Sequence, residues 1–393
     1  MIRKLKIGFL MPYSGIYPYY GHHLMAGMQI ALQPDHTSYS AGSGDGQLQF
    51  VPVFTKKGDP VTFKNAVEQL LFFERVDLLS GLISYRTMPD IIPLINDHRK
   101  PALLFDLGEY VPGFELQCPY VFYTSQQLWQ SEFALGYWAE HKFRDTGLVV
   151  LPFYESGYHL HSSFWEGIQA AGGAALKLHT VPKEKSSGHS LDLTDFFATI
   201  EKDKPAFVHG IFTGDQGTDF IKQWIRSPYN HKIPLILVEN MAYDDLLDDV
   251  GHLDCSFYSA SSWSRMDERP ENQKFVQKFE LASGQKANIF ALLGYEAGLM
   301  IREVQSGILR GDNEQVLQQL KATSIIGPRG PRNFDPMSIQ AMPQVDIQLI
   351  NMERNNTHKI IIDQVQNCLF SLDRISALHQ QSVSGWYNPY FCI

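Results

Sequence analysis

Polar and aromatic side chains gather in this chain where predicted buried strands end. The first such segment, PYSGIYPYYG (12–21), follows the short strand KIGFL and holds four tyrosines, each with a large apolar ring and a hydroxyl that needs a partner. Ser, Asp and Gly at strand ends also cap helices, but capping does not explain the tyrosines. Because ligands of open parallel sheets bind outside the carboxyl ends of the strands, these segments predict a small-molecule site. The other segments are SYRTMPD (84–90), DLGEY (106–110), FYESGYHLH (153–161), FTGDQGTD (212–219) and ENMAYDD (239–245).

Motifs for catalysis and metal binding are missing from the sequence. It contains no phosphate-binding P-loop, no G-x-S-x-G and no H-E-x-x-H. The one S-x-x-K, from Ser283 to Lys286, is better explained as the end of a helix with its glycine cap. Adjacent histidines at 22–23 would diverge by about 100° on a helix, and HLH (159–161) lacks an obvious third ligand. We therefore expect a binding protein that is not an enzyme and that uses no metal and no cofactor.

The composition restricts the classes of partner. The chain has 393 residues and a formal net charge of −9, and its acidic and basic residues are interspersed. A nucleic-acid or anionic-membrane surface needs a concentrated basic face, so we expect neither partner. No apolar run approaches the roughly 18 to 20 residues that span a bilayer, and MIRKLKIGFL lacks the long apolar core of a signal peptide. We expect either a cytosolic protein or a chain whose leader has been removed.

Strand-like and helix-like segments alternate along most of the chain. Short apolar runs such as PALLF and IPLILVE have the pattern of strands that helices cover on both faces. The clearest helix follows Asp59 and Pro60, which suit its N-cap and first turn. The alternation predicts an α/β fold of two doubly wound parallel-sheet lobes joined by a three-stranded hinge. Extended segments at 118–127, 254–263 and 327–336 are the predicted crossings between the lobes.

These crossings divide the chain into two lobes and a tail. The predicted first lobe comprises residues 1–120 and 258–328, and the second comprises residues 121–257 and 329–365. Residues 366–393 form a tail with the aromatic end GWYNPYFCI, which we expect to pack on the second lobe, with docking to a partner as the alternative.

Four cysteines form no C-x-x-C pair, so metal-ligand spacing is absent. They are Cys118, Cys255, Cys368 and Cys392. Cys368 and Cys392 bracket the tail and could staple it in an oxidising compartment. Four free thiols that pack as small apolar residues remain the alternative.

The opening segment IGFLMPYSGIYPYYGHHLMAGMQIAL resembles that of the type I periplasmic binding proteins of the branched-chain amino-acid (leucine/isoleucine/valine) branch. That family begins with a strand, a Pro-x-Ser-Gly turn, a tyrosine-glycine pair and a helix with small residues, and the similarity extends to about Asn351. The resemblance implies an extracytoplasmic receptor that closes over an amino acid or a related small solute and presents it to the membrane subunits of an ABC permease.

The resemblance also implies a set of ligand-binding residues. Tyr20 matches the tyrosine that flanks the ligand, and Ser84 matches the serine that holds the α-carboxylate. Glu239 falls where the family has an acidic partner for the α-ammonium group. Phe290 matches an aromatic wall of the pocket.

Two positions depart from the family pattern. Leu107, Gly108 and Glu109 stand where the family often has Ala-Thr, and Glu109 adds a carboxylate near the expected anion site. Ser156 precedes glycine where the family usually has a tyrosine, although Tyr154 is nearby. Both departures argue against a plain aliphatic amino acid as the ligand.

The charges of these positions suggest a ligand class. Two carboxylates in one closed cleft repel unless a cation lies between them or one takes up a proton. Arg86 could supply that cation, could anchor a ligand carboxylate itself or could be a solvated surface residue. Tyr20, Tyr85 and Tyr154 could stack on a planar or cationic group of the ligand. We therefore expect a ligand with at least one amine and some aromatic or planar character.

A cytosolic ligand sensor on the same fold is the alternative function. The missing leader favours the sensor, whereas a Cys368–Cys392 staple would favour export. In both cases we expect the ligand to stabilise a closed state by contacting both lobes.

Overall fold

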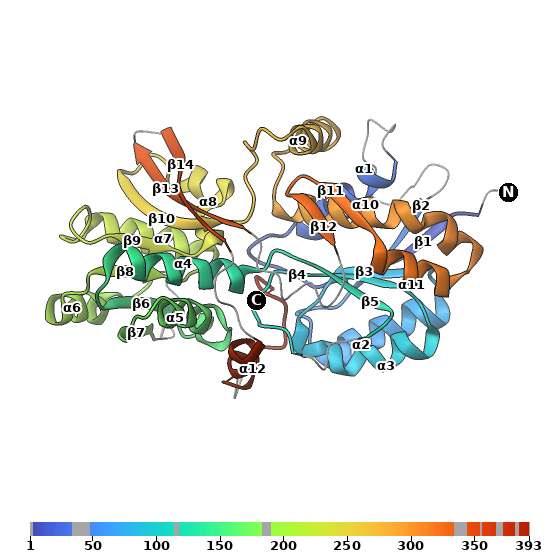
Figure 1. Cartoon of the computed structure of the whole chain (residues 1–393), viewed down its shortest axis with the longest axis horizontal. Coiled ribbons are helices and arrows are strands. Elements are labelled where there is room, and N and C mark those ends of the chain that lie inside the picture. The colour runs from blue at the N-terminus through green and yellow to red at the C-terminus, as the bar shows by residue number, and fades with distance from the viewer. Residues whose placement is uncertain are drawn as a thin grey trace.

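The chain folds into two α/β lobes that lie side by side, each built around its own sheet (Figure 1). The structure is a computed structural model that describes residues 3–33, 48–113, 118–182, 190–333, 344–353, 356–366, 372–381 and 385–392. The two sheets have five and seven strands, and a two-stranded hairpin packs on the first lobe. The predicted α/β class with two lobes is confirmed.

The first sheet is parallel throughout, with the strand order β2-β1-β3-β4-β5. Its inner strands β1, β3 and β4 are buried along almost their whole length, as expected for strands covered on both faces. The strands are β1 (Leu5–Met11), β2 (Leu48–Phe54), β3 (Leu78–Leu82), β4 (Ala102–Asp106) and β5 (Val121–Ser125). The helices of this lobe are α1 (Tyr20–Leu32), α2 (Pro60–Glu68) with its extension η1 (Gln69–Phe73), η2 (Tyr85–Thr87), α3 (Met88–His98), α9 (Pro270–Ser283), α10 (Ile289–Arg310) and α11 (Asn313–Ala322).

The start of α2 confirms the helix predicted after Asp59. The Asp59 carboxylate accepts a hydrogen bond from the Thr62 N–H at 3.0 Å, and Pro60 occupies the first turn. This N-cap satisfies one of the amide groups that every helix start leaves without an intrahelical partner.

The second sheet combines a parallel core with an antiparallel extension, in the order β14-β13-β10-β9-β8-β6-β7. Strand β13 runs antiparallel to β10, and β14 antiparallel to β13, so this sheet is mixed and not wholly parallel as predicted. Its strands are β6 (Gly147–Pro152), β7 (Leu176–Val181), β8 (Phe207–Gly210), β9 (Leu235–Leu237), β10 (Cys255–Ser261), β13 (Val345–Glu353) and β14 (Asn356–Val365). Its helices are α4 (Leu128–Phe143), η4 (Glu155–Gly157), α5 (Leu160–Ala170), α6 (Thr194–Asp203), α7 (Gly214–Arg226), η5 (Glu239–Ala242) and α8 (Asp244–Val250).

The chain passes between the sheets after β5, after β10 and after the hairpin of β11 (Ser324–Gly327) and β12 (Gly330–Asn333). All three of the segments predicted as extended crossings therefore contain sheet strands, namely β5, β10 and β12. Strand β5 belongs to the first sheet although the predicted boundary placed it in the second lobe, and β10 belongs wholly to the second sheet. The difference arises because strand pairing continues a few residues beyond the points where the sequence pattern changes.

A buried ion pair ties these crossings together. Arg329, at the turn of the hairpin, donates from Nη2 to the Glu296 carboxylate on α10 at 2.6 Å, and the two side chains are 4% and 0% exposed. Its Nη1 also donates to the carbonyl of Ser125, the last residue of β5, at 3.3 Å. One guanidinium thus links the end of β5, the hairpin and α10.

Both lobes pack a pair of helices through glycines. In the first lobe, a Cβ added at Gly27 of α1 would lie 2.0 Å from the carbonyl oxygen of Ala291 on α10. A Cβ at Gly294 of α10 would meet the carbonyl oxygen of Leu24 at the same distance of 2.0 Å. Any larger residue would force the two helix backbones apart. Helices α4 and α5 repeat this arrangement with Gly136 and Gly167.

This packing predicts the effect of replacing Gly27 with alanine. At an exposed helix position, alanine stabilises the helix by about 1 kcal/mol relative to glycine. At Gly27, however, the added methyl group would clash with the backbone of α10, so we expect Gly27→Ala to lower the free energy of unfolding by about 1–3 kcal/mol. Gly217→Ala in α7 is a matched control, because its Cβ would lie no closer than 3.3 Å from the Leu246 side chain and 3.5 Å from the Met241 side chain, neither of which is backbone. Urea unfolding measures both variants. A Gly27→Ala protein at least as stable as the parent would contradict the close approach of α1 and α10.

Candidate ligand-binding cleft

A cavity of about 290 Å³ lies between the two lobes, beside the carboxyl ends of β1 and β9. The loop after β1 and the start of α10 form its first-lobe side, and η5 and α8 form its second-lobe side. The carboxylates of Glu239 and Asp245 line it. Its position and composition are typical of small-molecule sites. Aromatic rings supply much of the wall, namely Tyr17, Tyr19, Tyr20, Tyr243, Trp263 and Phe290.

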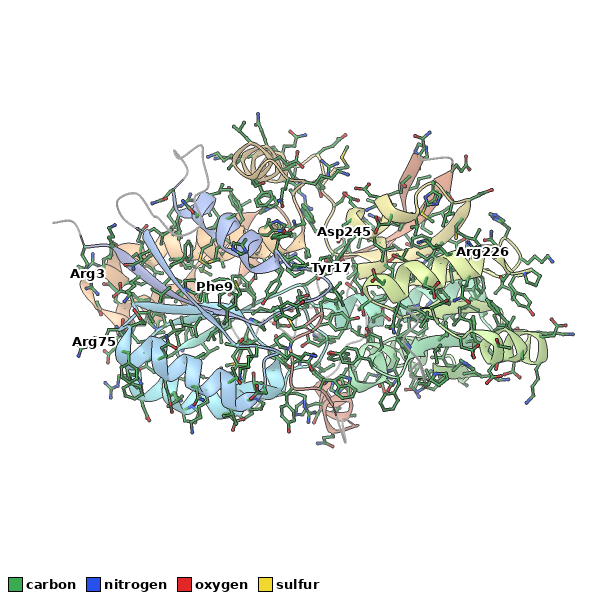
Figure 2. The ribbon with its side chains drawn as sticks, turned by 180° about the vertical axis from the view of Figure 1, so that it is seen from behind. Arg3, Phe9, Tyr17, Arg75, Arg226 and Asp245 are labelled. Carbon is green, nitrogen blue, oxygen red and sulfur yellow. The ribbon has the colours of Figure 1, made fainter. Side chains whose placement is uncertain are left out.

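Tyr17 and Asp245 join the lobes at this cavity, where they lie next to each other (Figure 2). The Tyr17 hydroxyl and the Asp245 carboxyl form a hydrogen bond. Burial is the main cause that raises the pKa of Asp245, and burial and this carboxylate together raise the pKa of Tyr17. The Tyr17 ring also packs edge-on against Phe290, with 5.2 Å between ring centroids. The carboxyl group of Asp245 and the aromatic rings of Tyr17 and Phe290 therefore lie close together in the cavity wall.

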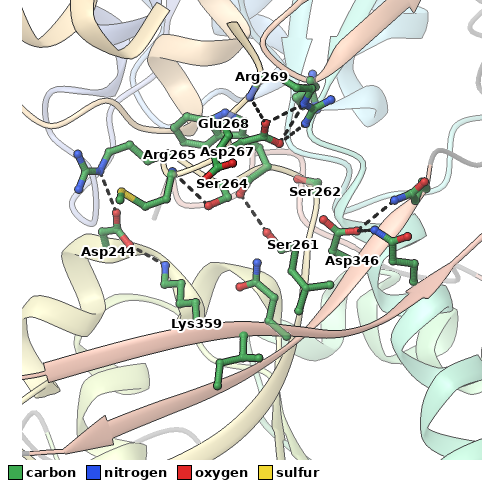
Figure 3. Close-up of a pocket in the computed structure, with 18 of the residues that line it drawn as sticks. Asp244, Ser261, Ser262, Ser264, Arg265, Asp267, Glu268, Arg269, Asp346 and Lys359 are labelled. Carbon is green, nitrogen blue, oxygen red and sulfur yellow. Dashed lines mark hydrogen bonds and ion pairs between the residues drawn. The ribbon is translucent and has the colours of Figure 1, made fainter. Parts of the chain in front are cut away.

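Most of the other charged groups around the cavity are already paired. Asp244 forms ion pairs with Lys359 at 2.6 Å and with Arg265 at 3.4 Å. Figure 3 shows both ion pairs in the groove that lies next to the cavity. Asp248 binds Lys286 at 2.6 Å. In the part of the chain that the structure describes, Glu239 and Asp245 form no ion pair, so these two carboxylates carry the uncompensated charge of the cavity.

Glu239 also organises the hinge. Its Oε2 accepts a hydrogen bond from Ser131 on α4 at 2.6 Å, and its Oε1 accepts from the Ser262 N–H and hydroxyl at 2.8 and 2.6 Å. Ser262 directly follows β10, at the second crossing between lobes. Burial raises the pKa of Glu239, and these hydrogen bonds oppose that shift. The Glu239 carboxylate is therefore held in place by donors from α4 and from the hinge.

The C-terminal tail (residues 385–392) runs between the lobes and does not pack on the second lobe alone, which corrects the prediction. Figure 1 shows the C-terminus at the boundary of the two lobes. Tyr390, Phe391 and Cys392 are at most 1% exposed. The physical reason is that these apolar side chains bury more surface in the cleft than either lobe alone would cover.

On the first-lobe side, the tail meets the loops after β1 and β4. The Ser14 hydroxyl donates to the Phe391 carbonyl at 2.6 Å, and the Phe391 ring lies 5.1 Å from the Tyr17 ring. The Tyr20 hydroxyl contacts the Cys392 thiol. Glu109 accepts a hydrogen bond from the backbone N–H of Tyr390.

On the second-lobe side, the tail meets η4 and the residue before it. The Trp386 indole donates to the Tyr154 carbonyl at 2.6 Å and stacks on the Tyr154 ring at 5.1 Å. The Tyr390 hydroxyl donates to Glu155 at 2.9 Å. The other Glu155 oxygen accepts from the Thr213 hydroxyl, also at 2.9 Å. Burial raises the pKa of Glu155 to about 7, so the tail covers a carboxyl group that titrates near neutrality.

The structure divides the predicted ligand-binding residues between two places. Tyr20, Glu239 and Phe290 line the cavity. Glu109 and Tyr154 contact the tail, as does Tyr20. These positions therefore converge on the boundary between the lobes.

Arg86 also faces the tail and not the open cavity. Its guanidinium lies 5.2 Å from the centre of the Tyr387 ring and 5.7 Å from that of Tyr110. These distances are in the range of cation–π contacts. Arg86 is therefore in contact with aromatic rings and is not a solvated surface residue.

Three of the predicted ligand-binding positions stabilise the backbone of nearby helices or turns. The Ser84 hydroxyl accepts from the Arg86 N–H at 3.4 Å, which caps η2. The Leu107 and Gly108 carbonyls accept from the first two amides of α4 at 3.0 and 2.8 Å. Gly108 has φ +76, and a Cβ there would lie 2.6 Å from Gln127, so this position favours glycine.

Two further predicted positions bond within their own lobes. Tyr85 packs 5.2 Å from Tyr123 and lies near the Asp106 carboxyl inside the first lobe. The Ser156 hydroxyl donates to the Phe153 carbonyl at 2.6 Å. Their side chains are therefore used in local structure.

Sequence reasoning did not select Tyr17, Glu155 or Asp245, which bridge the lobes or hold the tail. All three lie in the polar segments that follow predicted strands. The sequence shows that these residues are acidic or phenolic, but it does not show that they are buried. The resemblance to the family pointed instead to the nearby residues Tyr20, Tyr154 and Glu239.

The cysteines and metal-ligating groups add no further centre in the described ranges. Cys118, Cys255 and Cys392 are free and buried, while Cys368 lies outside the described residues. No three metal-ligating side chains come together among the residues that the structure describes. Within the same ranges, every helix is too short or too polar to cross a bilayer.

Residues 4–354 match the model of a family described as periplasmic binding protein. The chain belongs to this family. The resemblance to periplasmic binding proteins is therefore confirmed. No curated protein sequence matches this periplasmic binding protein.

Solved structures share the fold of this periplasmic binding protein at low sequence identity. An ABC transporter substrate-binding protein from Sphaerobacter thermophilus aligns with a TM-score of 0.76 at 19% identity, over 93% of this chain and 98% of that one. A solute binding protein from Rhodopseudomonas palustris BisB5 in complex with 3,4-dihydroxybenzoic acid aligns with a TM-score of 0.72 at 18% identity, with the same coverage of 93% and 98%. The branched-chain amino acid transporter substrate binding protein of Streptococcus pneumoniae, in complex with isoleucine, has a TM-score of 0.65 at 14% identity, over 91% of this chain and 99% of that one.

The Glu109 carboxyl predicts how stability depends on pH. Burial, and then the nearby Asp106, raise the pKa of Glu109 from 4.5 to about 8, and its Oε1 has no hydrogen-bond partner among the described residues. The folded protein therefore retains a proton that the unfolded chain loses above pH 4.5. Stability should fall as pH rises from about 4.5 to about 8, by up to about 1.4 kcal/mol per pH unit, and level off above that.

Glu109→Gln removes this titration and should flatten the slope, which urea unfolding at a series of pH values measures. Asp106 and Glu155, with pKa values raised to about 6 and about 7, should leave a weaker fall of the same sign. Glu303→Gln on the exposed face of α10 is the control and should keep the parent slope. A Glu109→Gln slope equal to that of the parent would contradict a protonated Glu109.

Proposed function

We propose that this periplasmic binding protein captures a small amine-bearing solute with aromatic or planar character, outside the cytoplasm, for an ABC permease. The observation that carries the proposal is the cavity between the lobes, with Asp245 and Glu239 as unpaired carboxylates among aromatic rings. The negative charge of the carboxylates and the aromatic rings of the wall together support a ligand that carries an amine.

The carboxylates argue for a positively charged group in the ligand. Burial disfavours their ionised forms, and a cation placed between them would offset that cost. The faces of Tyr17 and Phe290 also attract a cation, most strongly where water is excluded. An ammonium group beside Asp245 would gain from both effects.

The aromatic wall argues for a ligand with a flat apolar part. A cavity of about 290 Å³ is near the lower end of the usual range of ligand pockets, roughly 300–1,000 Å³. The relatives described above hold a dihydroxybenzoic acid and isoleucine. A benzoate carboxylate would meet the like charges of Asp245 and Glu239 here, so an aromatic amine is the better fit.

Capture would proceed by closure of the lobes. The ligand would contact Tyr17 and Phe290 of the first lobe and Asp245 and Tyr243 of the second. A solute that binds both surfaces stabilises the closed state by its difference in affinity for the closed and open states. The closed form is what a permease would recognise.

A cytosolic sensor on the same fold is the second candidate. The free thiols of Cys118, Cys255 and Cys392 favour it, because cytosolic proteins keep their cysteines reduced. Fractionation of the native host cells separates the two functions. Recovery outside the cytoplasm supports the transport receptor, and recovery in the cytosol supports the sensor.

A thermal-shift screen with small aromatic amines, amino acids and benzoates tests the ligand class. We expect amines to raise the melting temperature and benzoate to have no effect. Asp245→Asn should reduce the affinity for an active amine by about tenfold or more, because it removes a charge-assisted hydrogen bond. Phe290→Ala should weaken binding through the lost ring contact.

The control for this screen is Glu303→Gln, an exposed carboxylate on the same helix as Phe290. It should bind amines like the parent protein. Stabilisation by benzoates alone would overturn the amine proposal, as would an unchanged affinity in Asp245→Asn.

A further inference from the structure

We propose that the C-terminal tail (residues 385–392) is a peptide ligand built into the chain, and that the cleft is a binding site for aromatic peptides of this kind. In this role the tail bridges the lobes and holds them closed. The inference goes beyond solute capture and does not depend on the identity of the solute. The tail also lies outside residues 4–354, the part that matches the family.

The first observation is the burial of the tail. Tyr390, Phe391 and Cys392 are 1%, 1% and 0% exposed. Tyr390 lies 5.0 Å from the Tyr158 ring, and Phe391 lies 5.1 Å from the Tyr17 ring. These two neighbours belong to different lobes.

The second observation is that consecutive tail residues hydrogen-bond to opposite lobes. Phe391 accepts through its carbonyl from Ser14 of the first lobe at 2.6 Å. Tyr390 donates its hydroxyl to Glu155 of the second lobe at 2.9 Å. A group that binds both lobes at once favours the closed state, as a captured solute would.

The third observation is that glycines stand where the tail packs against the two lobes. A Cβ at Gly157 in the second lobe would lie 2.2 Å from the Trp386 indole nitrogen. A Cβ at Gly58, after β2 in the first lobe, would lie 2.5 Å from Pro389. Side chains at these positions would fill the space that Trp386 and Pro389 occupy.

The helix before the tail anchors it next to the cleft. In α12 (Leu372–Gln381), Arg374 donates to Glu166 of α5 at 3.0 Å. Leu378 of the same helix is fully buried in a small cluster with Val111 and Trp129. A tethered ligand acts at an effective concentration in the millimolar range for a short linker. The tail should therefore remain bound unless a competitor or a change in the lobes displaces it.

The experiment uses a chain that ends at Gln381 and a synthetic peptide of residues 385–393 with a fluorescent label at its N-terminus. We expect the shortened chain to bind the peptide saturably in fluorescence anisotropy. The intact chain should bind it about a hundredfold more weakly or worse, because its own tail fills the site. Small-angle X-ray scattering should show the shortened chain opening and the peptide closing it again.

Two peptide variants test the specific contacts. Tyr390→Phe removes the hydroxyl that donates to Glu155, and we expect about tenfold weaker binding. Tyr387→Phe is the matched control, because Tyr387 is 47% exposed and its ring, which faces Arg86, is kept. We expect its affinity to equal that of the parent peptide.

Three results would overturn the proposal: a folded shortened chain that does not bind the peptide, equal binding by the shortened and intact chains, or equal losses in the two variants. If the shortened chain does not fold, residues 382–384 of the full chain are replaced by a protease site and the folded protein is cut there. Retention of the severed tail in gel filtration then supports the proposal, and its loss overturns it. Because the probe is a peptide, failure to bind amines would refute the proposed solute and leave this result unaffected.

Discussion

The arrangement of the molecule depends on one buried guanidinium. Arg329 bonds to Glu296 and to the Ser125 carbonyl, so it joins the hairpin, α10 and the end of β5 at the places where the chain passes between lobes. A buried charge must be paired, and loss of one partner of such a pair typically costs about 3–5 kcal/mol. The chain segments that begin the first and third crossings are therefore held together on the first-lobe side.

The cleft between the lobes is rich in carboxyl groups, and each is accommodated in a different way. Glu239 is held by hydroxyl and amide donors of the hinge. Glu109 and Glu155 accept hydrogen bonds from Tyr390 of the tail, and their raised pKa values follow from burial beneath it. Asp245 meets a phenol of the opposite lobe. The contacts that bury these carboxyl groups therefore also favour their protonated forms.

The loop after β1 connects these features. Ser14 holds the tail, Tyr20 contacts the tail and lines the cavity, and Tyr17 packs between Phe391 and Phe290. Tyr17 and Tyr20 suit this position, since each packs its ring against Phe290 and directs its hydroxyl to another partner, whereas Tyr13 and Tyr19 are 58% and 65% exposed. A solute in the cavity and the tail in the cleft would touch opposite sides of the same short segment.

The sequence by itself determined the α/β class, the two lobes, the cap of α2 and the segments that meet at the cleft, because periodicity, capping and strand ends are local properties. It also indicated Tyr20, Glu239 and Phe290 as residues of the cavity wall. Only the tertiary structure decided that the tail lies between the lobes and that Glu155 and Asp245 are buried there. These features depend on contacts between residues far apart in the chain, and the burial of a polar residue is set by what packs over it, which no local pattern encodes.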